Sequence, residues 1–156
     1  MSRTEPILNR ILFASDTIQL GDEALHAAAE MASQLQAELA GLFIEDTNLL
    51  RLAGLPFAQE ICSSSATQRP LDLASMERTL REKAAEMRDA VASIAQRRNV
   101  PWSFGIRRGS VIHVTLAASE DADLLILARR EPHGIARRPV QSIPSERQPI
   151  LVVYDG

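Results

Sequence analysis

The chain has 156 residues, 46% of them hydrophobic, and a formal net charge of −3 at pH 7. This length suits one domain with an ordinary core, and the slightly acidic balance does not favour nucleic acid or an anionic membrane as a partner. A single cysteine excludes an internal disulfide framework and a cysteine-based zinc site. Without an apolar run of the length of a signal peptide or a membrane span, we expect a cytoplasmic protein.

The first third of the chain predicts a strand, a helix and a second strand. Residues 10–16, RILFASD, are a short apolar run that ends in a carboxylate. A helix is expected over residues 22–38, because its apolar positions recur at spacings of three and four. These positions are Leu25, Ala28, Ala29, Ala32 and Leu35. Residues 39–44 then predict a second strand, which is again followed by two acidic residues.

The connection over residues 47–70 differs from the segments on either side. Its first part, LLRLAGLPFAQEI, is apolar and predicts a short helix broken at Pro56. Residues 62–70, CSSSATQRP, are small and polar and predict a mobile loop. Connections of this length are usually functional or disordered. We interpret Cys62 in this loop as a spectator thiol, with a redox-sensitive thiol as the alternative.

The clearest helix is expected over residues 73–98. Its apolar stripe consists of Leu73, Met76, Leu80, Ala84, Met87, Val91 and Ile94. Charged residues fill most other positions, which is typical of a helix that covers one face of a sheet. We interpret the stripe as core.

The last third of the chain predicts three more strands and one more helix. Residues 102–109, WSFGIRRG, are expected to form a strand, and a helix over residues 110–121 follows, with Ser110 as its N-cap. Further strands are expected over 122–128 and 149–156. Short apolar strands alternating with helices are typical of an α/β fold with a doubly wound parallel sheet. Such sheets bind ligands beyond the carboxyl ends of the strands, where the strand order reverses.

Four segments resemble the universal stress protein family and together cover nearly the whole chain. They are RILFASD, ALHAAAEMASQLQAELAGLFIED, IRRGSVIHVTLAASEDADLLILARR and QPILVV. The resemblance implies a single domain over residues 1–156, with a five-stranded parallel sheet in the order 3-2-1-4-5, as in adenine nucleotide alpha hydrolases. It also implies a homodimer formed through the C-terminal strand. The strand order would then reverse beside Asp16 and Ala128. The closing ILVVYDG also resembles the start of another such domain, so half of a tandem protein is an alternative.

The segment after the fourth strand resembles the family's ATP-binding pattern G-x2-G-x9-G-[ST] in spacing but not in chemistry. The three glycine positions hold Ala128, Glu131 and Gln141, and the final hydroxyl is kept as Ser142. Glycines let backbone N–H groups approach phosphates closely, and a carboxylate at Glu131 would repel them. The classical ATP site is therefore expected to be degraded. The short segment before Pro149 also predicts that the fourth helix of the family is short or absent.

The resemblance nominates four cofactor-binding positions, Asp16, Ile44, Ala128 and Ser142, and side-chain charge adds Arg129 and Arg130. Asp16, Ile44 and the arginines each have a structural alternative. Asp16 would otherwise be a turn residue, and Ile44 would otherwise be plain core. The arginines after the fourth strand, which include Arg137 and Arg138, would either bind an anion through their guanidinium groups or form a solvated basic loop. Arg107 and Arg108 would extend this patch if their strand ends nearby.

Our leading interpretation is a non-catalytic universal-stress-protein-like module that acts in stress response through dimerisation and partner binding. No cofactor is expected in this interpretation, no metal-ligand spacing relates the three histidines, and the binding surface includes residues 45–72 and the arginine loop. The alternative is an adenine-nucleotide-binding regulator with an altered phosphate loop that holds ATP. A nucleotide hydrolase is a weaker third reading, because no positioned general base or metal pair is visible.

Overall fold

The computed structural model of the protein describes residues 8–15, 22–56, 59–61, 68–70, 72–130 and 150–155. The elements in chain order are β1 (Arg10–Ser15), α1 (Asp22–Leu35), β2 (Glu38–Asp46), α2 (Thr47–Ala53), β3 (Gln59–Ile61), β4 (Gln68–Pro70), α3 (Leu73–Arg97), β5 (Trp102–Gly109), α4 (Val111–Ser119), β6 (Leu124–Arg130) and β7 (Ile150–Asp155). Within these residues, no helix is both long and apolar enough to cross a membrane.

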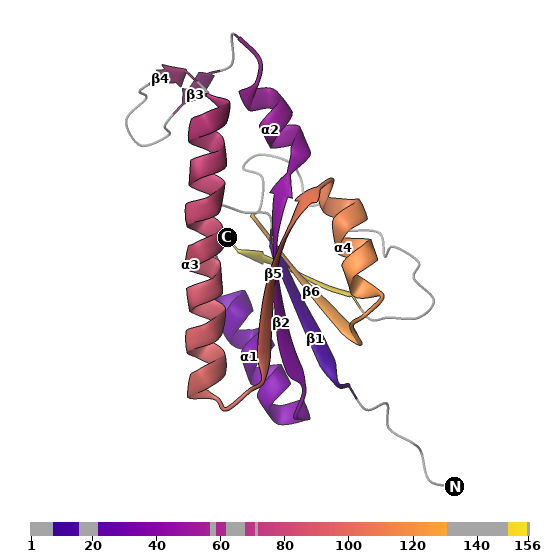
Figure 1. Cartoon of the computed structure of the whole chain (residues 1–156). Helices are drawn as coiled ribbons and strands as arrows, with labels where there is room; N and C mark the ends of the chain where they lie inside the picture. The colour runs from indigo at the N-terminus through magenta and orange to yellow at the C-terminus, as the bar shows by residue number, and fades with distance from the viewer. Residues whose placement is uncertain are drawn as a thin grey trace, which may run out of the picture.

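The main sheet has the strand order β5-β2-β1-β6-β7, and every neighbouring pair is parallel. The helices α1 and α3 cover one face, and α4 covers the other (Figure 1). A short antiparallel pair, β3 and β4, forms a second sheet. The predicted α/β class and parallel sheet are confirmed.

The central strand β1 contributes to two cores, one on each face of the sheet. Ile11 and Phe13 belong to the cluster under α1 and α3. Leu12 and Ala14 belong to the cluster under α4. All four are almost completely buried, as expected for a strand whose side chains alternate between two covered faces. This double burial explains why the strand reads as a continuous apolar run.

The long helix α3 keeps most of the predicted stripe in the core. Five of the seven positions are buried: Leu80, Ala84, Met87, Val91 and Ile94. The stripe leaves the core at its start, because Leu73 is the first helical residue and is 43% exposed. Leu35, the last residue of the α1 stripe, is also 43% exposed. In both helices the terminal position of the stripe is exposed, although the spacing predicts core.

The N-terminus of α3 is capped by Asp72. Its carboxylate accepts hydrogen bonds from Ser75 N at 3.1 Å and Ser75 Oγ at 2.9 Å. These bonds, that of the Ser75 side chain foremost, lower the pKa of Asp72 below its ordinary value, because they stabilise the ionised carboxylate. The cap fixes where α3 begins after the connection from β2.

The middle of α3 lies against β2 at a glycine. A Cβ on Gly41 would lie 2.9 Å from Phe104 Cδ2 and 3.1 Å from Val91 Cγ2. Gly41 therefore leaves room over β2 for the side chains of Val91 of α3 and Phe104 of β5.

A carboxylate also joins the amino ends of β1 and β6. Asp123 Oδ2 accepts hydrogen bonds from Asn9 N at 2.8 Å and Arg10 N at 3.0 Å. The backbone N–H of Asp123 donates to Arg10 O at 2.9 Å. Three hydrogen bonds thus fix the entry of β1 beside β6, the point at which the strand order reverses.

The connection between β2 and α3 contains more structure than its sequence predicts. The short helix is confirmed as α2, which is capped by Asp46 and ends at Ala53, before Pro56. The prediction of a loop through Pro70 is wrong at its end, because Gln68–Pro70 is strand β4, paired with β3. Figure 1 shows α2 and this hairpin beyond the carboxyl end of β2, at the N-terminal end of α3. Cys62 and residues 131–149, where the fourth helix was expected to be short or absent, lie outside the described residues.

Candidate functional site

The strand order reverses between β1 and β6, which makes the carboxyl edge of these two strands the candidate site. From β1 the chain goes on to β2 and β5 on one side, and β6 and β7 lie on the other. In α/β sheets, such a reversal separates the connecting loops and leaves room for a ligand. At this edge, Ser15 of β1 is in register with Ala128 of β6 and with Phe43 of β2. All three side chains are buried.

Ile44 and Ala128 lie at this edge on opposite faces of the sheet. Ile44 is fully buried in the cluster under α4. Ala128 is 3% exposed and belongs to the cluster under α1 and α3. Both side chains therefore pack in the core, so a ligand at this edge would meet the backbone of these residues rather than their side chains.

The strand β6 is longer than predicted, and this changes the place of two arginines. Arg129 and Arg130 lie in the strand, in register with Tyr154 and Asp155 of β7, whereas the sequence was interpreted as a loop after Ala128. Asp16, Ser142 and the loop arginines 137 and 138 lie outside the described residues. Of the six nominated positions, the structure therefore describes four at this edge: Ile44, Ala128 and the backbone of Arg129 and Arg130.

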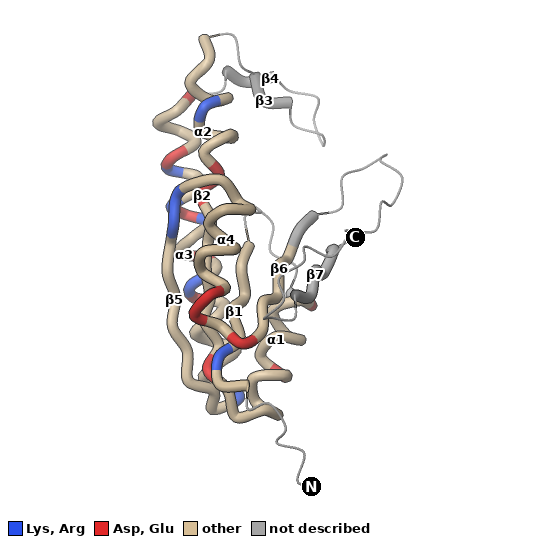
Figure 2. The backbone as a smooth tube through the Cα atoms, turned by 90° about the vertical axis from the view of Figure 1, so that its right-hand side faces the viewer, with Lys and Arg blue, Asp and Glu red and all other residues tan. Residues whose placement is uncertain are grey.

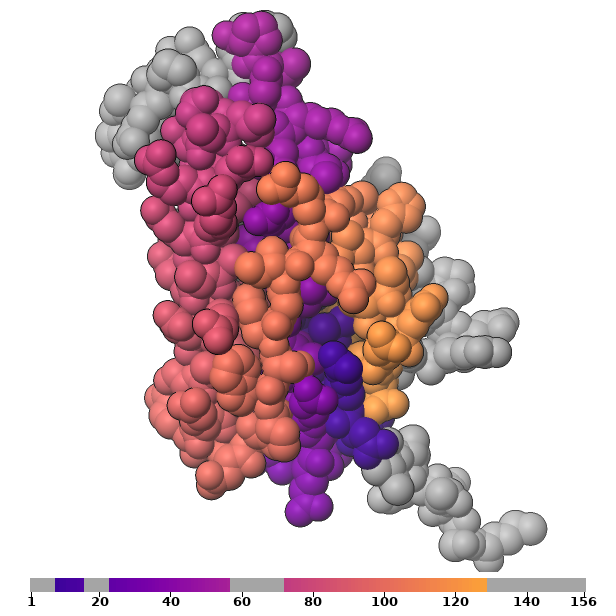
Figure 3. Space-filling model, in the orientation of Figure 1, coloured from indigo at the N-terminus to yellow at the C-terminus, as the bar shows by residue number. Residues whose placement is uncertain are grey.

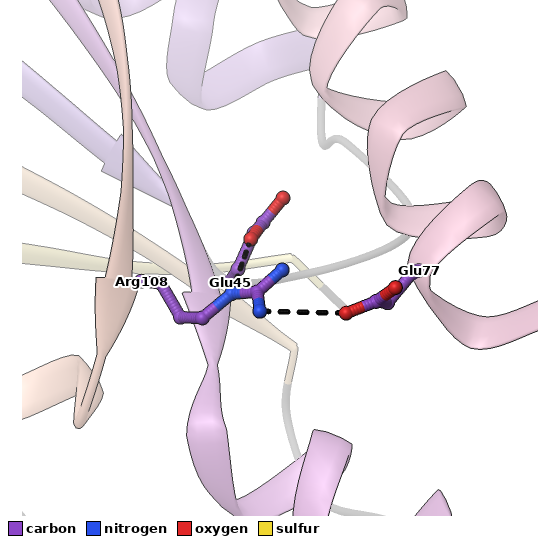
Figure 4. Close-up of polar contacts among 3 residues, drawn as sticks. All are labelled: Glu45, Glu77 and Arg108. Atoms are coloured by element: carbon purple, nitrogen blue, oxygen red, sulfur yellow. Dashed lines mark hydrogen bonds and ion pairs between the residues drawn. The ribbon is translucent and has the colours of Figure 1, made fainter. Parts of the chain in front are cut away.

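An ionic cluster of Glu45, Glu77 and Arg108 joins three elements near the carboxyl end of β2 (Figure 4). Arg108 Nε donates to Glu45 Oε2 at 2.9 Å, and Arg108 Nη1 donates to Glu77 Oε1 at 3.4 Å. Glu45 and Arg108 are in register on β2 and β5, and Glu77 lies on α3. The Glu45 side chain is 11% exposed, the most buried of the three, so its charge depends most on the partner.

The two carboxylates compensate the charge of Arg108. The hydrogen bond to Glu45 and then the charge of that carboxylate raise the pKa of the guanidinium above its ordinary value. Figure 2 shows the basic positions at the end of β5 beside acidic positions of β2 and α3. Arg108 is therefore already bound to acidic partners and is a poor donor for a phosphate.

The distance across the sheet also separates Arg107 and Arg108 from the strand reversal. Their strand β5 is not adjacent to β1, because β2 lies between the two. Arg107 is exposed and in register with Ile44. Arg108 therefore does not extend the basic patch that was predicted around the arginines after the fourth strand. The expected strand order 3-2-1-4-5 could have predicted the Glu45–Arg108 pair, because it makes the second and third strands, now β2 and β5, neighbours. Nothing in the sequence distinguishes Glu77 from the other acidic residues of α3.

The helix α4 begins directly after the carboxyl end of β5. Ser110 is its N-cap residue, as predicted, although its side chain makes no capping hydrogen bond. A Cβ on Gly109 would lie 2.6 Å from Val114 Cγ2, so glycine is required for α4 to fold back onto the sheet at this point. Among the described residues, no group of three or more His, Cys, Asp or Glu side chains is placed to hold a metal ion.

Solved structures of universal stress proteins share this fold. A universal stress protein family member from Burkholderia pseudomallei is 20% identical, with a TM-score of 0.60, over 96% of this chain and 98% of its own. The protein UspA from Lactobacillus plantarum is 20% identical, with a TM-score of 0.59, over 96% and 99%. An Arabidopsis thaliana family protein solved with AMP bound is 12% identical, with a TM-score of 0.55, over 95% and 92%.

No protein-family model and no curated protein matches the chain. At identities of 20% or less, the structural likeness establishes that the chain has the fold of universal stress proteins.

Proposed function

We propose that the chain is a universal-stress-protein-like module, a single domain over residues 1–156, that acts in a cytoplasmic stress response by dimerising and binding partners, without catalysis. The fold shared with the Burkholderia and Lactobacillus proteins supports this family assignment. The observation that carries the loss of the ATP site is the replacement of the three phosphate-loop glycines by Ala128, Glu131 and Gln141. Backbone N–H groups cannot wrap a triphosphate closely where side chains occupy these positions.

The proposed homodimer forms through β7. Its support is the place of β7 at the end of the order β5-β2-β1-β6-β7, because an edge strand offers unpaired backbone groups to a second chain. Sedimentation equilibrium should give a dimer or a larger assembly at micromolar concentration, and a monomer at every concentration would contradict this part of the proposal.

Partner binding is proposed for residues 45–72 together with the arginine loop. In support, Leu52 of α2, Leu55 after it and Leu73 at the start of α3 are 51%, 41% and 43% exposed. Large apolar side chains that gather on a surface are typical of sites where proteins meet.

The second candidate is an adenine-nucleotide-binding regulator, and the Arabidopsis protein with AMP bound favours it because the fold is shared. The contacts would come from Asp16, the backbone of Ile44 and Ala128, the arginines 129 and 130, and Ser142. In this case the arginine side chains take over the phosphate binding that the glycines perform in the family.

Thermal unfolding with and without nucleotide separates the two candidates. A ligand at one hundred times its Kd adds about 2.7 kcal/mol to the unfolding free energy. We expect no shift of Tm with roughly 5–10 mM ATP and Mg²⁺, or with AMP at the same concentration. These concentrations would nearly saturate a nucleotide site of millimolar affinity. A shift that Ser142→Ala abolishes would replace the leading proposal with the nucleotide regulator.

A restoration experiment tests the reason for the loss. The triple variant Ala128→Gly, Glu131→Gly, Gln141→Gly rebuilds the glycine pattern, and we expect it to gain a nucleotide-dependent Tm shift that the parent chain lacks. The single variant Ala128→Gly is the matched control, because it leaves the carboxylate of Glu131 in the phosphate path. A triple variant that folds but does not bind would contradict the role assigned to the glycines.

A further inference from the structure

The strand β5 is the edge of the sheet opposite β7, and its outer side runs along the surface. It is eight residues long, Trp102–Gly109, and pairs with β2 through its inner side. Figure 3 shows it across the front of the molecule, between α3 and α4. No strand within the part of the chain that the structure describes pairs with this outer side.

The hydrogen bonding of β5 to β2 determines which residues face outward. Leu39 N donates to Pro101 O at 2.9 Å, and Leu39 is in register with Trp102. In a parallel ladder, residues 101, 103, 105 and 107 therefore direct their N–H and C=O groups toward β2. Residues 102, 104, 106 and 108 direct theirs to the outer side, so an extended strand has four residues with which to pair there.

The middle of this edge holds a glycine that the chain itself does not require. A Cβ on Gly105 would meet no atom within 4 Å, whereas a Cβ on Gly41 or Gly109 would collide with a neighbouring side chain. Glycine in the interior of a strand weakens the strand, and it often marks a place where another backbone approaches closely. Within the part of the chain that the structure describes, no side chain packs where the Cβ of residue 105 would lie, and the glycine suits close contact with a second backbone.

We propose that β5 pairs antiparallel with β5 of a second copy of this chain, around a two-fold axis at Gly105. A two-fold interface places the same patch of both copies together, so the pairing must be self-complementary. With the axis at Gly105, Phe104 lies opposite Ile106 of the second copy, and Trp102 lies opposite its Arg108. On the other face, Ser103 lies opposite Arg107. No two like charges lie directly opposite each other.

The exposure and hydrogen-bond pattern of β5 agree with this register. Ile106 is 50% exposed, and in the pairing its side chain meets the ring of Phe104. Arg108, whose guanidinium is held by Glu45 and Glu77, lies opposite Trp102 of the second copy. The outward residues 104 and 106 become a hydrogen-bonded pair, and the two Gly105 residues become a non-hydrogen-bonded pair with Cα atoms about 4.5 Å apart. That is the closest backbone approach in an antiparallel ladder, and it falls at the glycine.

The register one step along, centred on Ile106, is less favourable. It would place Ile106 against its own copy and move Phe104 opposite Arg108, and it would bring Arg107 opposite Gly105. The two exposed Arg107 side chains would then lie on diagonal neighbours, about 8 Å apart, instead of at opposite ends of the pairing. This comparison selects the axis at Gly105.

Disulfide cross-linking tests the proposal, in a Cys62→Ser background that leaves no other thiol. At Gly105→Cys, the two Cα atoms fall within the 4.4–6.8 Å range of disulfides, so mild oxidation should give a covalent dimer. At Ser103→Cys, the two copies of the residue would lie about 14 Å apart, so this variant should give no covalent dimer under the same oxidant. An equimolar mixture of Ser103→Cys and Arg107→Cys should give a mixed dimer.

The same series contains the outcomes that would overturn the proposal. No covalent dimer from Gly105→Cys, or equal yields at positions 103 and 105, would exclude this pairing. Cross-linking of Ile106→Cys in preference to Gly105→Cys would place the axis at the other register and remove the explanation for the glycine. Because β7 lies at the opposite edge of the sheet, a negative result here leaves the dimer proposed through β7 untouched.

Discussion

The neighbouring strands β2 and β5 are in register over eight residue pairs, yet they occupy opposite environments. Seven of the nine residues of β2 are buried, whereas β5 has no buried residue and four exposed ones. Each contains an interior glycine, Gly41 in β2 and Gly105 in β5. Gly41 is required by close packing inside the chain, and Gly105 is not. The comparison indicates that close packing constrains the residues of the inner strand, and that the edge strand is free of this constraint at Gly105.

The largest effect is expected from Gly41→Ala. The new Cβ would press on Phe104 and Val91, and overpacking of a core of this kind costs about 1–3 kcal/mol of unfolding free energy. Gly105→Ala is the matched control and should change the unfolding free energy by less than about 1 kcal/mol, because the added methyl enters open space. Urea unfolding of both variants measures the difference. Equal losses would contradict the contrast between inner strand and edge.

The next effect is expected from Asp123→Ala, also at the inner strands. The substitution leaves Asn9 N and Arg10 N without their acceptor, and an unsatisfied donor costs about 1–3 kcal/mol, less where water reaches it. Asp121→Ala, two residues away and exposed, is the control and should be close to neutral. Faster hydrogen exchange at Arg10 in Asp123→Ala alone would locate the loss at the start of β1.

A smaller effect is expected from Arg108→Gln, at the edge strand. The ion pair with Glu45 and Glu77 is lost, but half of the Arg108 side chain is exposed, so water screens much of the interaction. We expect a lower Tm than in Arg107→Gln, and a difference between the two variants that shrinks as NaCl is raised. A difference that does not depend on salt would show that Arg108 stabilises through packing instead.

The smallest effect concerns pH and the exposed cap of α3. The pKa of Asp72 is lowered in the folded state, so its contribution is present above the unfolded value of about 3.8 and is lost as pH falls through the folded value. Asp72→Asn keeps a capping side chain and removes the titration. The unfolding free energy of the parent should therefore fall more steeply than that of Asp72→Asn below about pH 4. Parallel pH profiles would mean that the cap is not coupled to folding.

Much of the inner part of the molecule could be predicted from the sequence. The spacing of apolar residues located α3, because the sheet covers five successive positions of its stripe. The same rule failed at Leu73 and Leu35, since spacing does not tell where a helix passes beyond the sheet. The pair β3 and β4 was missed because three-residue strands are too short to show an alternating pattern.

The contacts between distant residues were harder to predict. The Glu45–Arg108 pair follows from the strand order, but Glu77 is one of many acidic residues on α3, and its partner depends on how the helix lies on the sheet. Asp123 resembles any carboxylate in a turn before a strand. Its two acceptor bonds are to residues 113 and 114 positions away, a relation that no local pattern contains.

That long separation bears on how the chain assembles as it leaves the ribosome. The partner of β1 on one side, β2, is synthesised within seconds, but β6 and the carboxylate that fixes it follow more than one hundred residues later. At a translation rate of 5–20 residues per second, an apolar strand destined for the centre of the protein waits on the order of 5–20 s with one side unpaired. The nascent domain is most exposed to aggregation in this interval, when a chaperone would have its clearest target.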